Sequence, residues 1–292
     1  MPTRSLAVAL AATAALLLTV ASADAAQLVR TWHVNSAFGV AVNPDLNDVY
    51  VSERHGHRII EYWYNGHHVR SWGGHGSHHG QFNQPAGIAV AENGNLYVAD
   101  ELNHRVQEFT RKGVFIRAFS HGMQHPYGVA VLPGGDVLVT DWKANRIQRF
   151  TSTGSLVGTF AHVGSPFGLT YAPASDTVYV TTGSSGYVVQ FYTNGRHIND
   201  WGDRGKGAGQ FTAFAGGVTT DAQGIVYVAD TDGHRINTFI GDSTFLGSFG
   251  HYDYRDTTGG GLNHPWGIAA SQRDNAVYVA DQDHNRLKEF RR

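Results

Sequence analysis

Acidic and basic residues recur together at a fixed spacing along the chain. Five carboxylates each close a short apolar stretch, and an Arg follows each of them at five residues. The carboxylates are Glu53, Asp100, Asp141, Asp230 and Asp281, and the Arg residues are Arg58, Arg105, Arg146, Arg235 and Arg286. Scattered carboxylates can hold a catalytic cation in a hydrolase- or lactonase-like site. A guanidinium repeated beside each carboxylate instead favours a structural ion pair between neighbouring segments.

Histidine supplies the second group of candidate ligands. The 292-residue chain has 17 His and no Cys, which excludes disulfides, zinc–thiolate sites and thiol nucleophiles. Within residues 74–80, the imidazoles of His75, His78 and His79 form a candidate metal site, because such nitrogens bind Zn, Cu or Ni ions. The alternative is a solvated polar loop made flexible by its glycines. We expect no resident cofactor, with zinc or calcium as the ions to consider.

The elements that position these residues are repeated strands. A Gly followed by an apolar stretch recurs at intervals of 48, 41, 40, 49 and 50 residues: Gly39, Gly87, Gly128, Gly168, Gly217 and Gly267. A second apolar stretch follows about ten residues after each Gly, as in Leu96-Tyr97-Val98. Third and fourth stretches are separated by hairpin turns such as Asn65-Gly66 and Lys112-Gly113. No segment after residue 26 shows sustained helical periodicity.

Four short antiparallel strands repeated at this period predict an all-β, six-bladed β-propeller over residues 27–292. The last repeat stops after its third strand, whereas residues 27–33 match the pattern of a fourth strand. We therefore expect residues 27–33 to complete the last blade and close the ring. The fourth repeat departs most from the others, with Thr182 and Tyr187 in place of the acidic residue and the Arg.

These residues resemble the NHL repeat family. Pro85-Ala86-Gly87-Ile88 with Asn103-His104-Arg105-Val106 is close to that family's pattern. The resemblance implies a six-bladed propeller, and members of the family include binding modules and the peptide-amidating lyase. In that lyase, His residues directly after the Pro bind zinc at the channel mouth. The matching positions here are Phe38, Ala86, Tyr127, Phe167, Gly216 and Trp266, and none is His.

The resemblance places aromatic rings where the lyase has its zinc ligands. We predict a ligand-binding funnel at the centre of one face, formed by Phe38, Tyr127, Phe167 and Trp266 and rimmed by His125 and His264. Such a surface suits a peptide loop, a glycan or a small apolar ligand. The alternative is that the rings fill the channel as core.

The first 25 residues have the pattern of a secretory signal peptide, with Arg4, an apolar run over residues 6–20 and Ala23-Asp24-Ala25. We expect a secreted or periplasmic, monomeric protein with no other membrane segment. Lys and Arg number 22 against 24 Asp and Glu, which argues against a nucleic-acid partner.

The sequence thus favours an exported binding or scaffold module with a protein, peptide or glycan ligand, rather than an enzyme. The alternative is a metal-assisted lyase or hydrolase acting at the top of the central channel.

Overall fold

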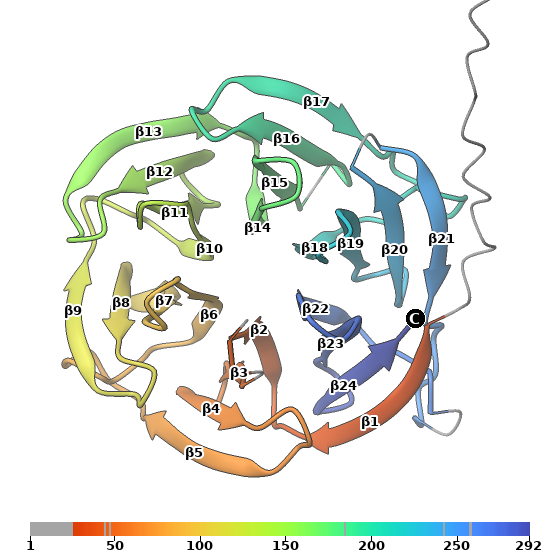
Figure 1. Cartoon of the computed structure of the whole chain (residues 1–292), viewed down its shortest axis with the longest axis horizontal. Helices are drawn as coiled ribbons and strands as arrows, with labels where there is room; N and C mark the ends of the chain where they lie inside the picture. The colour runs from red at the N-terminus through yellow and green to blue at the C-terminus, as the bar shows by residue number, and fades with distance from the viewer. Residues whose placement is uncertain (1–25, 44, 47, 184, 242, 257–258) are drawn as a thin grey trace, which may run out of the picture.

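The computed structural model describes residues 26–43, 45–46, 48–183, 185–241, 243–256 and 259–292. These residues form 24 β-strands, arranged as six antiparallel sheets of four strands each, and one short 3-10 helix. The sheets stand side by side around a central axis (Figure 1). The predicted six-bladed propeller is confirmed, whereas the predicted signal peptide at residues 1–25 lies outside the described residues.

Each blade runs from an inner strand at the axis to an outer strand at the rim. Blade 1 contains β2 (Ala37–Val42), β3 (Val49–Glu53), β4 (Arg58–Tyr62) and β5 (His68–Gly73). Blade 2 contains β6 (Pro85–Val90), β7 (Leu96–Asp100), β8 (Arg105–Phe109) and β9 (Phe115–Phe119), with the 3-10 helix η1 (Glu101–Asn103) between β7 and β8. Blade 3 contains β10 (Pro126–Val131), β11 (Val137–Asp141), β12 (Arg146–Phe150) and β13 (Leu156–His162). Blade 4 contains β14 (Pro166–Ala172), β15 (Thr177–Thr182), β16 (Val188–Tyr192) and β17 (His197–Trp201). Blade 5 contains β18 (Ala215–Thr220), β19 (Ile225–Asp230), β20 (Arg235–Ile240) and β21 (Phe245–Phe249). Blade 6 contains β22 (Pro265–Ala270), β23 (Ala276–Asp281), β24 (Arg286–Arg291) and β1 (Gln27–His33).

Burial follows the position of a strand within its blade. The second strands are apolar on both faces and lie between neighbouring blades, so that every residue of β3, β7 and β11 is buried. The outer strand β1 alternates between exposed and half-buried residues, and β5 likewise contains exposed and half-buried residues, as expected for sheet edges with one face in water. Stacking of the blades therefore forms the hydrophobic core, because one isolated sheet has nothing to cover its apolar faces.

The repeated glycines mark the close approach of adjacent inner strands. A Cβ atom on Gly128 would lie 2.4 Å from the carbonyl oxygen of Phe167 in the next blade. The same collision recurs around the ring, from Gly39 against Ala86 O at 2.2 Å to Gly267 against Phe38 O at 2.0 Å. Glycine is needed here because any side chain would force the backbones of two blades apart.

Hydroxyl groups bridge some of these inner strands. The Oγ1 atom of Thr140 accepts a hydrogen bond from Gly128 N at 2.6 Å and donates one to Phe167 O at 2.8 Å. Ser52 makes the equivalent bridge in blade 1, with both bonds at 2.7 Å. Buried polar groups of the inner strands are thus satisfied across the blade junction.

The N-terminal strand closes the ring. Strand β1 pairs with β24 in antiparallel register, from Gln27 opposite Arg291 to His33 opposite Arg286. Blade 6 is therefore built from both ends of the described chain, as predicted (Figure 1).

Four of the five predicted ion pairs are present. Within their blades, Nε of Arg105 lies 2.8 Å from Asp100 Oδ2 and Nε of Arg235 lies 2.9 Å from Asp230 Oδ2. Arg58 pairs with Glu53, and Nη2 of Arg146 lies 3.5 Å from Asp141 Oδ2. These pairs join the second and third strands of a blade, which supports a structural role.

The fifth prediction is wrong, because Asp281 has a different partner. The ammonium of Lys288, which is fully buried, lies 3.0 Å from Asp281 Oδ2, and Arg286 instead reaches Asp256 at 3.8 Å. The long linker before blade 6 supplies Asp256 and the carbonyl of Gly261, both of which accept hydrogen bonds from Lys288. The linker thus changes the ion pairing of this blade.

Candidate functional site

The loops between second and third strands and the linkers between blades share one face of the propeller, called the top face here. At its centre, two sets of positions repeat around the channel. The first set follows the start of each inner strand: Phe38, Ala86, Tyr127, Phe167, Gly216 and Trp266. The second set follows the end of each second strand: Arg54, Glu101, Trp142, Gly183, Thr231 and Gln282. The fold therefore brings twelve positions that are distant in sequence to the top-face mouth of the central channel.

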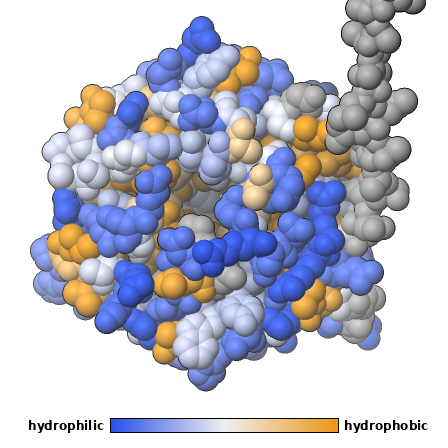
Figure 2. Space-filling view, viewed as in Figure 1, coloured by the Kyte–Doolittle hydropathy of each residue, from blue (hydrophilic) through white to orange (hydrophobic). Residues whose placement is uncertain are grey.

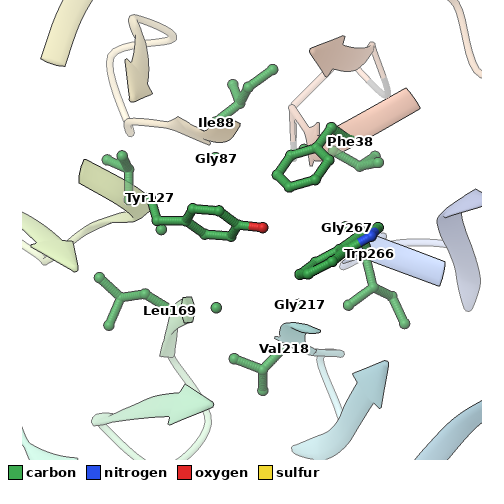
Figure 3. Close-up of a pocket in the computed structure, with 15 residues that line it drawn as sticks. Phe38, Gly87, Ile88, Tyr127, Leu169, Gly217, Val218, Trp266 and Gly267 are labelled. Atoms are coloured by element: carbon green, nitrogen blue, oxygen red, sulfur yellow. The ribbon is translucent and has the colours of Figure 1, made fainter. Parts of the chain in front are cut away.

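Aromatic rings from the first set meet across the channel. The ring centroid of Phe38 lies 5.4 Å from that of Tyr127 and 5.3 Å from that of Trp266. The rings of Tyr127 and Phe167 are 4.7 Å apart in an edge-to-face arrangement. Figure 3 shows Tyr127 reaching from one side of the channel towards Phe38 and Trp266 on the other. These contacts make a continuous aromatic partition across the axis.

The partition separates two cavities. The inner cavity has a volume of about 60 Å³ and is lined by Phe38, Tyr127 and Trp266 together with the channel glycines and the aliphatic residues that follow them (Figure 3). The outer cavity, called the upper recess here, has a volume of about 250 Å³. It is lined by Phe38, Arg54, Glu101, Tyr127, Trp142, Phe167, Phe214, Trp266 and Gln282. The upper recess thus combines an aromatic floor with a few polar groups, the usual composition of a small-ligand site.

Arg54 and Glu101 form an ion pair in the wall of this recess. Nη2 of Arg54 lies 2.6 Å from Glu101 Oε2, and the side chains are 14% and 5% exposed. The guanidinium also lies over the ring of Phe38, 4.5 Å from its centroid. Nη1 of Arg54 is buried and has no hydrogen-bond partner among the described residues. A buried donor without a partner is costly unless a ligand or water satisfies it.

The second carboxylate oxygen of Glu101 faces blade 3. Oε1 of Glu101 lies 3.2 Å from His125 Nδ1 and accepts a long hydrogen bond of 3.4 Å from Trp142 Nε1. The imidazole of His125 packs on Trp142, with ring centroids 5.2 Å apart. Glu101 is therefore held between two blades, and its position fixes that of Arg54.

The phenol of Tyr127 is neutral at physiological pH. Burial has the largest effect and raises the pKa of Tyr127 well above its usual value, against a lowering by Arg54 that is larger than the rise caused by the Glu101 carboxylate. The formal charges lining the upper recess are therefore those of Arg54 and Glu101, which compensate each other.

The structure brings together five of the six residues predicted to bind a ligand. Phe38, Tyr127 and Phe167 are buried, with exposed fractions of 5%, 8% and 7%, so they form the floor rather than an open surface. Trp266 is half-buried and lines both cavities. His125 lies behind the wall through its contact with Glu101.

The sixth predicted residue lies apart from the recess lining. Nδ1 of His264 is 2.7 Å from Asp283 Oδ2, and its Nε2 is 3.6 Å from Asp232 Oδ1. The imidazole also packs against His234, with centroids 4.8 Å apart. His264 therefore belongs to the junction between blades 5 and 6.

The three histidines of the predicted metal site point to different neighbours. His75 packs against His57 with centroids 4.5 Å apart, and His79 stacks on Phe115 at 4.4 Å. Among the described residues, His75, His78 and His79 do not form a group with converging ligand atoms. Metal binding by these residues stays a prediction, without support from this geometry.

One other group of side chains has the geometry of a cation site. Ligand atoms of Asp256, Asp281 and His284 lie within 4.8 Å of one another in the described part of the chain. The ammonium of Lys288 already lies among them, 2.5 Å from Asp256 Oδ1 and 3.0 Å from Asp281 Oδ2. The positive charge that these carboxylates need is thus supplied by the protein itself.

Histidine or asparagine side chains connect the blades at four junctions. Nδ1 of His57 accepts a hydrogen bond from Gln84 N at 3.1 Å, and Nδ1 of His234 accepts one from His264 N at 3.3 Å. Asn145 and Asn285 occupy the matching positions and accept from Ser165 N at 2.8 Å and Ser36 N at 2.7 Å. All four of these connecting residues have φ between 53° and 55°, in the left-handed region.

Several recess residues were not predicted from the sequence, namely Arg54, Glu101, Trp142, Phe214 and Gln282. Four of them directly follow the end of a second strand, one position after the acidic residue of the repeat. Their periodic placement was the available signal. It is weak because the six side chains at this position differ in type, as expected where a fold varies its surface rather than its core.

The view in Figure 2 shows hydrophilic residues over most of one face, with apolar residues in separate small patches. Among the described residues, no helix has the length and apolar character needed to cross a membrane.

Comparison with known proteins identifies the repeats and the fold. Residues 82–109, 123–150 and 262–290 match the family model described as NHL repeat. These segments cover the first three strands of blades 2, 3 and 6. No curated protein matches the sequence.

Solved structures of several enzymes are similar in fold. Virginiamycin B lyase from Staphylococcus aureus has a TM-score of 0.65 and 11% identity, over 91% of this chain and 99% of that one. A gluconolactonase from Xanthomonas campestris has a TM-score of 0.68 and 14% identity, over 92% of this chain and 95% of that one. Hydrazine synthase from Kuenenia stuttgartiensis has a TM-score of 0.64 and 13% identity, over 89% and 96% of the two chains. At these identities the likeness extends to the fold alone.

Proposed function

We propose that this NHL-repeat propeller is an exported binding module that holds its ligand in the upper recess, with the surrounding loops of the top face as additional contacts. The observation that carries the proposal is the unpartnered Nη1 of Arg54 in the wall of a recess floored by aromatic rings. A ligand with an acceptor oxygen would satisfy this donor while covering the rings. A protein, a peptide or a glycan can supply both groups.

The donor set of the recess favours binding over zinc-assisted catalysis. Among the described residues, Glu101 is the one carboxylate in its lining, and its oxygens already face Arg54, His125 and Trp142. Gln282 adds an amide, but no His lines the recess in the part of the chain that the structure describes. A catalytic zinc site uses three protein ligands with an open position, and these residues do not supply such a set.

The binding role can be tested with side chains that line the recess without filling the core. Trp142 and Phe214 are half-buried, so Trp142→Ala and Phe214→Ala should change the recess with less damage than changes at the buried Tyr127. The residue-27–292 protein would be screened against displayed peptides and printed glycans. We expect binding that both variants weaken.

Trp63→Ala is the matched control, because Trp63 is 48% exposed in the turn between β4 and β5 on the opposite face. This variant should bind like the unchanged protein. Equal binding by all three variants would contradict a site in the recess. Stoichiometric zinc in the purified protein, lost together with a hydrolytic or lyase activity, would favour the enzymatic alternative.

A further inference from the structure

We infer that the upper recess is built for an uncharged sugar ring, such as a terminal residue of a neutral glycan. This inference rests on the proposed binding function and specifies its ligand. Three features of the recess lead to it: the balance of charge, the pairing of donor and acceptor groups, and the accessible aromatic surface.

The charge balance argues for an uncharged ligand. Arg54 and Glu101 neutralise each other at 2.6 Å, and the phenol of Tyr127 stays protonated. A carboxylate or phosphate on the ligand would compete with Glu101 for Arg54 and leave one acidic group without a partner in a buried place. Leaving a buried charge unpaired is strongly unfavourable.

The polar groups match adjacent hydroxyls. Apart from the ion pair between Arg54 Nη2 and Glu101 Oε2, the buried donor Nη1 of Arg54 and the buried acceptor Oε2 of Glu101 have no hydrogen-bond partner among the described residues. The amide of Gln282 in the same lining can do both. A hydroxyl also donates and accepts, so two neighbouring hydroxyls on one ring can satisfy a donor and an acceptor that lie side by side.

The aromatic surface matches the apolar face of the same ring. Trp142, Phe214 and Trp266 are half-buried and remain accessible above the buried floor. Aromatic rings carry a negative face, which attracts the partly positive C–H groups of a sugar. A large apolar side chain of a peptide would cover these rings, but the acceptor for Arg54 Nη1 would have to come from a different group, such as a backbone carbonyl. One sugar ring offers both surfaces together.

The experiment removes both charges at once. A single substitution of Arg54 or Glu101 would leave its buried partner uncompensated, whereas apolar replacement of a whole pair is often tolerated. The double variant Arg54→Met/Glu101→Leu therefore removes the polar wall and keeps the volume. Arg149→Met/Asp136→Leu is the control, because that pair is also 2.6 Å long but lies on the opposite face, away from the recess lining.

Both variants and the unchanged protein, all as residues 27–292, would be applied to an array of neutral, sialylated and sulfated glycans, after thermal melting has shown that they fold. The unchanged protein and the control should bind neutral glycans, and the recess variant should bind them about tenfold or more weakly, as expected for loss of a hydrogen bond to a charged group. Soaking a bound monosaccharide into crystals should place its ring beside Trp142.

Binding restricted to sialylated or sulfated glycans would overturn the inference, and so would neutral-glycan binding that the recess variant retains. If no glycan binds but a displayed peptide does, with sensitivity to Trp142→Ala, the sugar inference fails while the proposed binding function stands. If neither class binds through the recess, both fail.

Discussion

Gly128 shows how a single atom can decide the spacing between two blades. A Cβ atom there would lie 2.4 Å from a backbone oxygen of the next blade, which cannot rotate away. We expect Gly128→Ala to destabilise the protein by about 1–3 kcal/mol, the usual cost of overpacking. Urea unfolding followed by fluorescence would measure the loss.

Gly164→Ala is the matched control for that substitution. A Cβ atom on Gly164 would have no heavy atom within 4 Å, and its φ lies outside the left-handed region. Its unfolding midpoint should stay within error of the unchanged protein. An equal loss in both variants would contradict the collision at the inner strands as the reason for glycine.

At the scale of single residues, the sequence predicted structural roles better than partners. The repeated acid and Arg pairs were predicted because their spacing is constant, and four of the five are present. The exception at Asp281 depends on the buried Lys288 and on the linker residue Asp256. The position of a linker depends on tertiary contacts, and no local sequence pattern predicts it.

The blade junctions contain hydrogen bonds that depend on pH. Nδ1 of His57 and of His234 must be unprotonated to accept from a backbone N–H group, whereas the amides of Asn145 and Asn285 do the same work at any pH. Burial lowers the pKa of His57 and of His234, and the neighbouring His75 and His264 lower them further.

Acidic groups act in the opposite direction at both junctions. Near His57, Asp100 raises the pKa, while His55 lowers it as His75 does. Near His234, the pKa is raised by Asp232, Asp230 and Asp283, and Tyr252 packs on the ring at 4.5 Å. The net shift is downward for both histidines, so the folded protein favours the neutral imidazole.

The sign of the pH effect follows from that shift. The unfolded chain takes up a proton near pH 6.5, whereas the folded protein does so at lower pH. The contribution to stability is therefore complete above about pH 6.5 and is lost as the pH falls towards the folded values. Melting temperatures at pH 8 and pH 5 should differ less in His57→Asn/His234→Asn than in the unchanged protein. The reason is that a contribution of about 1 kcal/mol to the free energy of unfolding at each junction no longer depends on pH.

His104→Asn serves as the control for the junction prediction. Its Nδ1 faces the carbonyl oxygen of Gln124, so that protonation preserves the donor in that bond. This variant should keep the full loss of stability at pH 5. If the double Asn variant loses as much stability in acid as the unchanged protein, the junction histidines do not set the pH dependence.

At the scale of the strands, the sequence predicted the blades because two signals agreed. The hairpin turns and the short apolar stretches indicated the same strand boundaries, and the Gly before each first stretch gave the period of the repeat. The upper recess was predicted only in its floor. Its wall comes from Arg54 in blade 1 and Glu101 in blade 2, and their contact depends on the distance between two blades, which no single repeat encodes.

For the molecule as a whole, closure depends on β1. This strand supplies the outer edge of blade 6, and its residue Trp32 stacks on Tyr62 and Tyr278 with ring centroids 6.4 and 5.9 Å apart. Deletion of residues 27–33 should therefore expose the edge of β24 and lower the melting temperature sharply. Differential scanning calorimetry at several protein concentrations would measure this change, because an open edge also promotes association.

Deletion of residues 291–292 is the comparison, since it shortens the chain from the other end but keeps most of the pairing between β1 and β24. That variant should melt close to the unchanged protein. A truncation at residue 33 that melts at the original temperature would disprove the role of β1 in closing the ring.

The pairing of Gln27 with Arg291 also places the first and last strands of the propeller next to each other. A short peptide linker between them would therefore produce a covalently closed chain. New termini could be placed in a hairpin turn such as Lys112-Gly113, far from the recess. During synthesis, β1 is made first but cannot pair until β24 has been made. The ring of blades therefore closes only after the last blade has emerged.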